Sequence, residues 1–150
     1  MRIVIDADGC PVVDIAVAIA REEQRECLIL CDTAHDFQKQ GASTLTFSQG
    51  ADSVDFGLVN LLQPGDVVVT QDYGLAAMCL ARNAKVLNQD GMAYTNDNID
   101  ALLLSRHTAK KIRNAGGRLK GASKRTRSQD EAFAQALRAL VKGEKEGCGE

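Results

Sequence analysis

The sequence lacks the patterns that build membrane spans, disulfide frameworks and zinc sites. No apolar run approaches the ~20 residues that a membrane-spanning helix needs. There are five cysteines, an odd number, which does not suit a complete set of disulfides. No Cys-x-x-Cys pair occurs and there are only two histidines, so the usual ligand pattern of a zinc site is missing. A charged strand end is expected as early as Asp6, which leaves no room for a signal peptide. We therefore expect a cytoplasmic protein with no membrane association, whose cysteines are small core residues rather than metal ligands.

Acidic residues are missing from one long stretch. From Arg106 to Arg127 there are nine Lys or Arg and no Asp or Glu, although the whole chain has a net charge of −2. Such a block is either a solvated face or a surface that binds a polyanion, and we favour RNA or another single-stranded nucleic acid. The stretch has no aromatic residue, so binding should follow the phosphate backbone with little sequence preference. The candidate nucleic-acid-binding residues are Arg106, His107, Lys110, Lys111, Arg113, Arg118, Lys120, Lys124, Arg125 and Arg127.

Apolar strands alternate with helical patterns along the chain, which predicts an α/β fold. Strands are expected at 3–5, 26–31, 43–47, 67–70 and 85–87, and helices at 12–20, 54–62, 75–80, from 99 onward and at 130–141. The predicted fold is a three-layer, doubly wound parallel sheet of about five strands in the order 3-2-1-4-5. We expect one domain over residues 1–142, with a basic loop at about 115–129 and a disordered tail at 143–150.

Aspartates follow several of the predicted strands. Asp6 and Asp8 follow the first strand and Asp72 follows the fourth, so strand order 3-2-1-4-5 brings them to one crevice at the switch point of the sheet. Converging carboxylates need a cation or raised pKa values, and an all-oxygen site suits Mg²⁺ or Mn²⁺. The candidate catalytic residues are Asp6, Asp8, Asp72 and Thr70; the candidate metal ligands are Asp6, Asp52, Asp55, Asp72 and Asp90.

Several of these residues also have a purely structural interpretation. Asp8 and Asp72 can each cap the helix that follows, and Asp52 and Asp55 resemble a capping box at a helix start. Asp90 beside Gly91 is a natural turn pair. Cys10 lies at a helix start, where a thiol pKa can fall, but the neighbouring carboxylates oppose the thiolate, so a nucleophilic role is not favoured.

Four segments together resemble the YaiI/YqxD family. They are Ile5-Asp6-Ala7-Asp8-Gly9-Cys10-Pro11, Gly50-Ala51-Asp52-Ser53-Val54-Asp55, Gly65-Asp66-Val67-Val68-Val69-Thr70-Gln71-Asp72-Tyr73-Gly74-Leu75-Ala76 and Asn98-Ile99-Asp100, and the resemblance spans about residues 1–140. That family is similar to PIN-like nucleases, whose sites combine an aspartate after strand one, acidic residues on a central helix and a Thr-x-Asp after strand four. The resemblance implies that Asp6, Asp52 or Asp55, and Asp72 take those places, with Asp90 as a fourth.

These observations leave three functions open. The first is a metal-dependent ribonuclease or related phosphodiesterase. The second is a haloacid-dehalogenase-like phosphatase, with Asp6 as nucleophile and Asp8 as acid/base; it needs a lysine, and only Lys39 lies between the two acidic motifs. The third is a non-catalytic RNA-binding module. A homodimer is compatible with the sequence.

Overall fold

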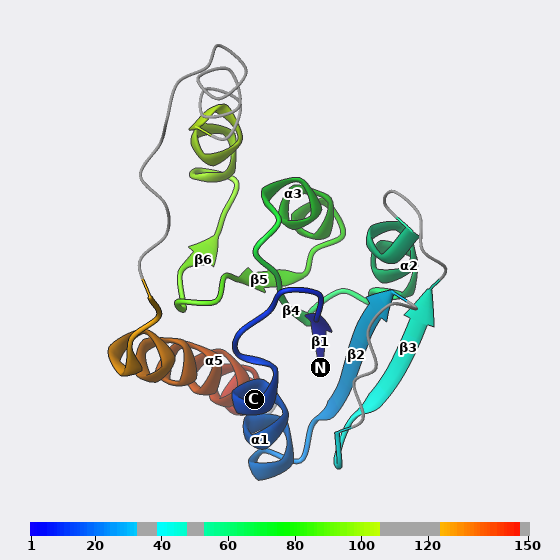
Figure 1. Cartoon of the computed structure of the whole chain (residues 1–150), viewed down its shortest axis with the longest axis vertical. Coiled ribbons are helices and arrows are strands. Elements are labelled where there is room, and N and C mark those ends of the chain that lie inside the picture. The colour runs from blue at the N-terminus through cyan, green and yellow to red at the C-terminus, as the bar shows by residue number, and fades with distance from the viewer. Residues whose placement is uncertain (33–38, 48–52, 106–123, 148–150) are drawn as a thin grey trace.

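The computed structural model describes residues 1–32, 39–47, 53–105 and 124–147, and its centre is a six-stranded sheet (Figure 1). The strand order is β3-β2-β1-β4-β5-β6, and the first five strands in this order pair in parallel. This confirms the predicted order 3-2-1-4-5. The strands are β1 (Arg2–Asp6), β2 (Glu26–Asp32), β3 (Ser43–Phe47), β4 (Val67–Val69), β5 (Lys85–Leu87) and β6 (Ala93–Tyr94).

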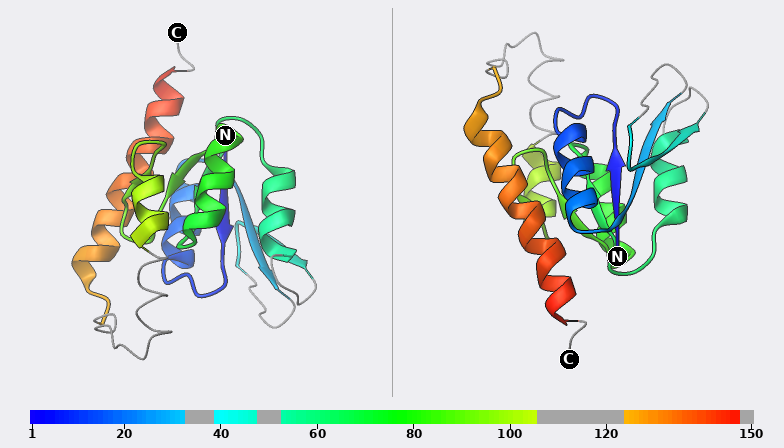
Figure 2. Two further views of the ribbon diagram at one scale, coloured as in Figure 1. Left: turned by 90° about the horizontal axis from the view of Figure 1, so that it is seen from above. Right: turned by 90° about the horizontal axis from the view of Figure 1, so that it is seen from below.

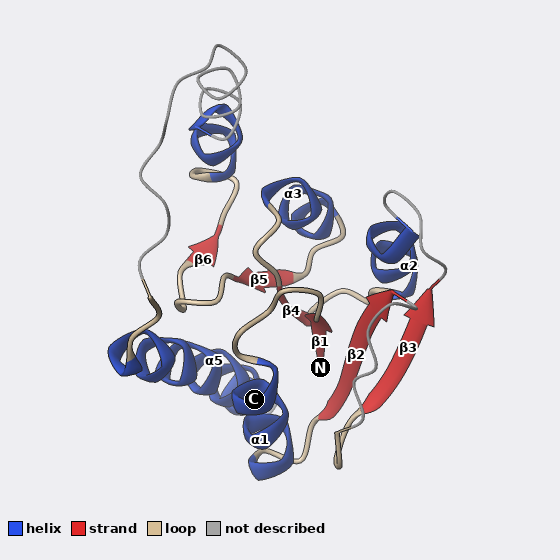
Figure 3. Cartoon of the chain, in the orientation of Figure 1, coloured by secondary structure: helices blue, strands red, loops and turns tan. Residues whose placement is uncertain are grey.

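Helices cover both faces of the sheet, which completes the three predicted layers (Figures 1 and 3). On one face lie α1 (Val13–Glu22) and α5 (Arg127–Gly147), which contact each other. The other face carries α2 (Ser53–Leu61), α3 (Tyr73–Ala81) and a helical segment at 99–105. Figure 2 shows the sheet between these two groups of helices. A parallel sheet needs this double cover because its strands are apolar on both faces.

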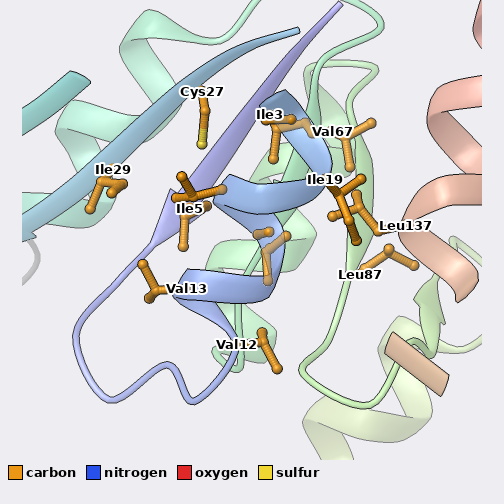
Figure 4. Close-up of a cluster of buried hydrophobic side chains, with 14 of the residues drawn as sticks. Ile3, Ile5, Val12, Val13, Ile19, Cys27, Ile29, Val67, Leu87 and Leu137 are labelled. Atoms are coloured by element: carbon orange, nitrogen blue, oxygen red, sulfur yellow. The ribbon is translucent and has the colours of Figure 1, made fainter. Parts of the chain in front are cut away.

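The core is divided by the sheet, because successive residues of a strand point to opposite faces. Ile3 and Ile5 of β1 pack toward α1, where Phe133, Leu137 and Val141 of α5 close the same cluster (Figure 4). Val4, between them, packs toward α2 and α3. A spacing of four residues on α5 places these buried side chains on one helical face, as the amphipathic pattern predicts.

The bounds of α5 correct two expectations. The helix begins at Arg127, within the predicted basic loop, because Thr126 and Gln129 form a capping box: Thr126 Oγ1 accepts from Gln129 N–H at 3.3 Å, and Gln129 Oε1 accepts from Thr126 N–H at 2.7 Å. It continues to Gly147, beyond the predicted end at Val141. Lys and Glu, which are strong helix formers, alternate in this last stretch.

Strand β6 was not predicted. The expected turn after β5 is present, with Asn88 Oδ1 accepting from the N–H groups of Asp90 and Met92, but it returns the chain as a short antiparallel strand. Gly91 in this turn has a φ of +87°, and an added Cβ would lie 2.7 Å from the carbonyl oxygen of Ala132 in α5. The turn therefore packs against α5 at a position that only glycine fits.

The described cysteines lie mainly in the core. Cys27, Cys31 and Cys79 are buried, as expected of small core residues, and Cys10 is partly buried. Cys148 lies outside the described part of the chain. Among the helices that the structure describes, none combines the length and the apolar character needed to cross a membrane.

Candidate functional site

The candidate site forms where β1 and β4 end side by side. The two strands pair in parallel, with Ile5 opposite Val69, so the residues that follow them reach the same edge of the sheet. Asp6 is the last residue of β1, while Thr70, Gln71 and Asp72 connect β4 to α3. This is the switch point of the sheet, since the chain runs from β1 outward to β3 and then crosses back to β4.

A crevice of about 470 Å³ opens at this edge. Asp6 and Asp8 reach it from the end of β1, Asp55 from the first turn of α2, and Asp72 from the start of α3. Its remaining lining side chains are Val54, Gln71 and Tyr73. The structure thus brings together four of the aspartates predicted as site residues. Asp52, the fifth candidate near α2, lies outside the described residues.

Thr70 connects Asp6 and the backbone of Asp72 through its hydroxyl group. The side chain is fully buried; its Oγ1 donates to Asp6 Oδ2 at 2.8 Å and accepts from the N–H of Asp72 at 3.1 Å. Asp72 caps α3, because its Oδ1 accepts from the N–H groups of Gly74 at 2.9 Å and Leu75 at 3.2 Å. Asp72 is therefore both a cap and a lining residue of the crevice, so its two interpretations are compatible.

The electrostatics of the crevice are clearest at Asp6. The pKa of its carboxyl group is raised from 3.8 to about 6, first by burial, and further by the negative charges of Asp55, Asp8 and Asp72. The hydrogen bond from Thr70 acts in the opposite direction and favours the carboxylate. A carboxyl group that titrates near pH 6 and lines an open crevice is a recognised mark of a functional site.

Two hydrogen bonds, each between a side chain and a backbone group, hold the loop after β1 in place. Asp8 Oδ2 accepts from the N–H of Asp32 at the end of β2, at 3.1 Å. The side-chain amide of Gln71 donates to the carbonyl oxygen of Gly9 at 2.7 Å, which ties this loop to the one after β4. Asp8 thus contacts β2 and lines the crevice, and the N-cap position of α1 is taken by Val12, which makes no side-chain capping bond.

Asp90 is not among the residues that line the crevice. Its Oδ1 pairs with Arg125 Nη1 at 2.7 Å, and Arg125 Nε also pairs with Asp130 at 2.6 Å. Arg125 therefore joins the turn after β5 to the first turn of α5. Both residues were predicted to bind ligands, Asp90 a metal and Arg125 nucleic acid, and the structure shows them bound to each other.

Most of the predicted nucleic-acid-binding residues lie outside the described part of the chain. Of the ten, only Lys124, Arg125 and Arg127 lie within the described part of the chain. Lys124 is exposed, and Arg127 is exposed with a salt bridge to Glu131 one helical turn away. The other seven, from Arg106 to Lys120, lie outside the described residues.

Cys10 is close to the site without sharing its chemistry. Burial raises the pKa of its thiol, and the charge of Asp6 raises it further. These shifts oppose thiolate formation, in agreement with the sequence-based expectation.

Three lining residues were missed by the sequence analysis as members of the site: Val54, Gln71 and Tyr73. The signal for Gln71 was its place between Thr70 and Asp72 after a buried strand. Val54 and Tyr73 immediately adjoin aspartates that were predicted, Asp55 and Asp72. Their inclusion depends on side-chain direction, which the sequence pattern alone does not give.

The donors of the crevice match a hard cation in chemical type. Four carboxylates supply only oxygen ligands, as Mg²⁺ and Mn²⁺ prefer, and their mutual repulsion would fall on cation binding. Within the described residues, no group of three or more Asp, Glu, His or Cys side chains is already arranged to hold one ion.

Comparisons with known proteins identify relatives along nearly the whole chain. The model of a family described as "Uncharacterized BCR, YaiI/YqxD family" matches residues 4–143. A UPF0178 protein of Exiguobacterium sibiricum is 53% identical over 141 residues, covering 94% of this chain and 96% of the relative. A UPF0178 protein of Ruminiclostridium cellulolyticum is 47% identical over 147 residues, covering 98% and 96%. No solved structure matches the chain significantly. The names of these relatives state no activity, and the likeness to PIN-like nucleases stays a prediction.

Proposed function

The chain belongs to the YaiI/YqxD family, and we propose that it is a metal-dependent ribonuclease that cleaves phosphodiester bonds in its acidic crevice. One observation carries the proposal: four aspartates from β1, α2 and the start of α3 line one crevice, and three of them raise the pKa of the fourth, Asp6. Carboxylates gathered at the switch point of a parallel sheet are suited to hold divalent cations against a phosphate group.

The roles of the residues follow from their positions. Asp6, Asp55 and Asp72 would hold Mg²⁺ or Mn²⁺, and the bound ion would activate a water molecule and neutralise charge on the phosphate and its leaving oxygen. Thr70 fixes the direction of Asp6 through the 2.8 Å hydrogen bond and holds Asp72 through its backbone N–H. Asp8, tied to β2, lines the same crevice and would accept a proton from the attacking water.

The basic block from Arg106 to Arg127 supports a nucleic-acid substrate through its charge alone. The basic block adds most to the binding affinity of a polyanion that is long enough to reach both the block and the crevice. We propose RNA as that polyanion and the cytoplasm as the compartment, because free, buried cysteines are typical of a reducing environment.

The phosphatase alternative finds less support. It requires a lysine beside the nucleophilic aspartate, and the residues known to line the crevice include no lysine. Lys39, the lysine that lies between the two acidic motifs, instead pairs with Asp14 of α1 at 2.8 Å. We therefore do not propose phosphoryl transfer to Asp6.

The direct test is cleavage of a single-stranded oligoribonucleotide with Mn²⁺, with Mg²⁺ and with a chelator. We expect cleavage with metal only, and its loss in Asp6→Asn, which keeps the side-chain volume but removes the charge. Asp97→Asn is the matched control, because Asp97 is exposed and does not line the crevice. Metal-dependent cleavage that Asp6→Asn leaves intact would place the activity elsewhere, and RNA binding without any cleavage would favour a binding module.

A further inference from the structure

The crevice has an apolar wall that the proposed chemistry does not use. Tyr73 comes from the first turn of α3 and Val54 from the first turn of α2, and both side chains line the same space as the four aspartates. Val54 has no polar side-chain atom, and the ring of Tyr73 offers an apolar face. An aromatic ring beside an aliphatic side chain is a suitable surface for the flat face of a nucleobase.

The ring of Tyr73 is held in position by a second tyrosine. Tyr94 of β6 packs against it edge-to-face, with ring centroids 5.9 Å apart and an angle of 64° between the planes. Tyr94 is itself only 3% exposed, and its hydroxyl donates to the carbonyl oxygen of Thr70 at 3.3 Å. A ring that is already fixed loses little conformational freedom when a ligand stacks on it.

The same buried residue orients both parts of the crevice. Thr70 anchors Tyr94 through its carbonyl oxygen and Asp6 through its hydroxyl group. The aromatic wall and the carboxylates are therefore fixed relative to each other by the segment between β4 and α3. A base on Tyr73 and a phosphate near Asp6 would belong to one nucleotide or to two adjacent nucleotides.

The size of the crevice limits what can enter. About 470 Å³ is within the range of small-molecule sites, roughly 300–1,000 Å³, and is suited to one nucleotide rather than to a double helix. A base within a duplex is paired and stacked, so it reaches such a site only after it leaves the helix. A single strand meets this requirement at much lower cost.

We propose that Tyr73 is a stacking platform for one unpaired base, which makes single-stranded nucleic acid the substrate class of the crevice. The inference rests on the proposed function, because it takes the crevice to be the place where the substrate is held. It names a specificity-determining residue, and its consequence is discrimination against double-stranded substrates.

The tyrosine content of the chain allows a direct readout of this contact. The sequence has two tyrosines and no tryptophan, so Tyr94→Phe leaves Tyr73 as the one tyrosine and the main source of intrinsic fluorescence. The variant is titrated, with a chelator present, with a single-stranded oligoribonucleotide and with an abasic oligomer that carries the same number of phosphates. We expect the first to quench the emission and the second to leave it unchanged, because only a base can stack on the ring.

Affinity gives an independent measure. Tyr73→Leu should weaken binding of the single-stranded oligoribonucleotide by about 5- to 150-fold, the usual loss for one stacked base. Tyr73→Phe, which keeps the ring, should bind within about twofold of the wild type by the same stacking argument. Phe56→Leu is the matched control, since Phe56 lies on α2, is 60% exposed and does not line the crevice.

The outcomes separate this inference from the proposed function. Unchanged affinity in Tyr73→Leu, equal quenching by the abasic oligomer, or equal binding of duplex and single strand would each overturn the stacking role. Metal-dependent cleavage by the wild type would still stand in those cases. Conversely, quenching and a loss of affinity in Tyr73→Leu without any metal-dependent cleavage would support the base site and overturn the nuclease.

Discussion

Thr70 Oγ1 donates a hydrogen bond to Asp6 Oδ2 over 2.8 Å, from a side chain that is fully buried at the end of β4. Asp6 ends β1 and Thr70 directly follows the adjacent parallel strand β4, and the two residues are 64 positions apart in the sequence. The contact lowers the pKa of Asp6, whereas burial and three neighbouring carboxylates raise it. The hydrogen bond from Thr70 thus lowers the free-energy cost of placing a charged carboxylate at this edge of the sheet.

The first prediction concerns this hydroxyl group. Thr70→Val leaves Asp6 Oδ2 and the N–H of Asp72 without their hydrogen-bond partner, so the free energy of unfolding should fall by about 1–3 kcal/mol. The pKa of Asp6 should also rise, since the contact that favours its charged form is gone. Urea unfolding and an NMR titration of the Asp6 carboxyl group measure the two effects. Thr70→Ser keeps the hydroxyl and should retain most of the stability and the original pKa; a Ser variant as perturbed as Val would contradict the hydrogen-bond explanation.

The second prediction is the pH dependence of stability that Asp6 produces. Its pKa is about 6 in the folded state and 3.8 in the reference state, so the folded protein binds this proton more tightly than the unfolded chain does. The contribution is therefore most favourable below about pH 4 and is lost as the pH rises through about 6. At 1.36 kcal/mol per pKa unit, the loss amounts to about 2–3 kcal/mol.

Asp6→Asn removes this titration. With a chelator present, the stability of Asp6→Asn relative to the wild type should increase by about 2–3 kcal/mol between pH 4 and pH 8. Urea unfolding at several pH values checks this difference, with the exposed Asp97→Asn as the control that should follow the wild type. A constant difference across this pH range would show that Asp6 titrates normally.

The sequence predicted the sheet and most of the site because both follow from the same pattern. Strands buried on two faces appear as unbroken apolar runs, and polar residues directly after β1 and β4 must meet once the strand order is known. That order brought Asp6, Asp8 and Asp72 together. The two-residue strand β6 has no periodicity to detect, so its pairing with β5 could not be predicted.

Other features depend on partners that are distant in the sequence. Arg125 and Asp90 are 35 residues apart, and nothing local distinguishes Arg125 from the other basic residues of its block. Tyr73, which lines the crevice, packs edge-to-face against Tyr94 on an unpredicted strand. The capping box of Thr126 and Gln129 was present in the sequence, but the surrounding basic residues favoured a loop interpretation.

The third prediction concerns divalent cations. Mn²⁺ or Mg²⁺ should raise the melting temperature, because the ion binds the folded crevice and not the unfolded chain. At a concentration 100-fold above Kd the gain is about 2.7 kcal/mol, or about 5–10 °C for a chain of this size. Asp6→Asn should remove most of the shift. Asp72→Asn should do the same while retaining the cap of α3, since Asn is as good an N-cap as Asp.

Thermal unfolding with and without the ion measures this shift, and Asp97→Asn should respond like the wild type. The wild type unfolding at the same temperature with and without millimolar Mn²⁺ would contradict the metal site, and the ribonuclease proposal would fail with it. A shift that survives in both crevice variants would instead indicate a different binding site.

The fourth prediction separates two adjacent basic residues. Arg125 is held by Asp90 and Asp130, whereas Lys124 is exposed, so their contributions to nucleic-acid binding should differ. Lys124→Gln should reduce the slope of log affinity against log salt by about 0.7 for single-stranded RNA if it neutralises one phosphate. Arg125→Gln should leave that slope unchanged and lower the free energy of unfolding by about 1 kcal/mol, a modest value because its partners are partly exposed.

Arg125→Lys provides the matched control for geometry. A lysine keeps the charge but cannot reproduce the fork that joins Asp90 to Asp130, so it should recover little of the lost stability. Binding isotherms at several salt concentrations, together with urea unfolding, measure both properties on the same variants. If Arg125→Gln flattened the salt dependence and left stability intact, Arg125 would be exchanging its carboxylate partners for phosphate groups. The ion pairs would then compete with RNA binding rather than fasten α5 to the turn after β5.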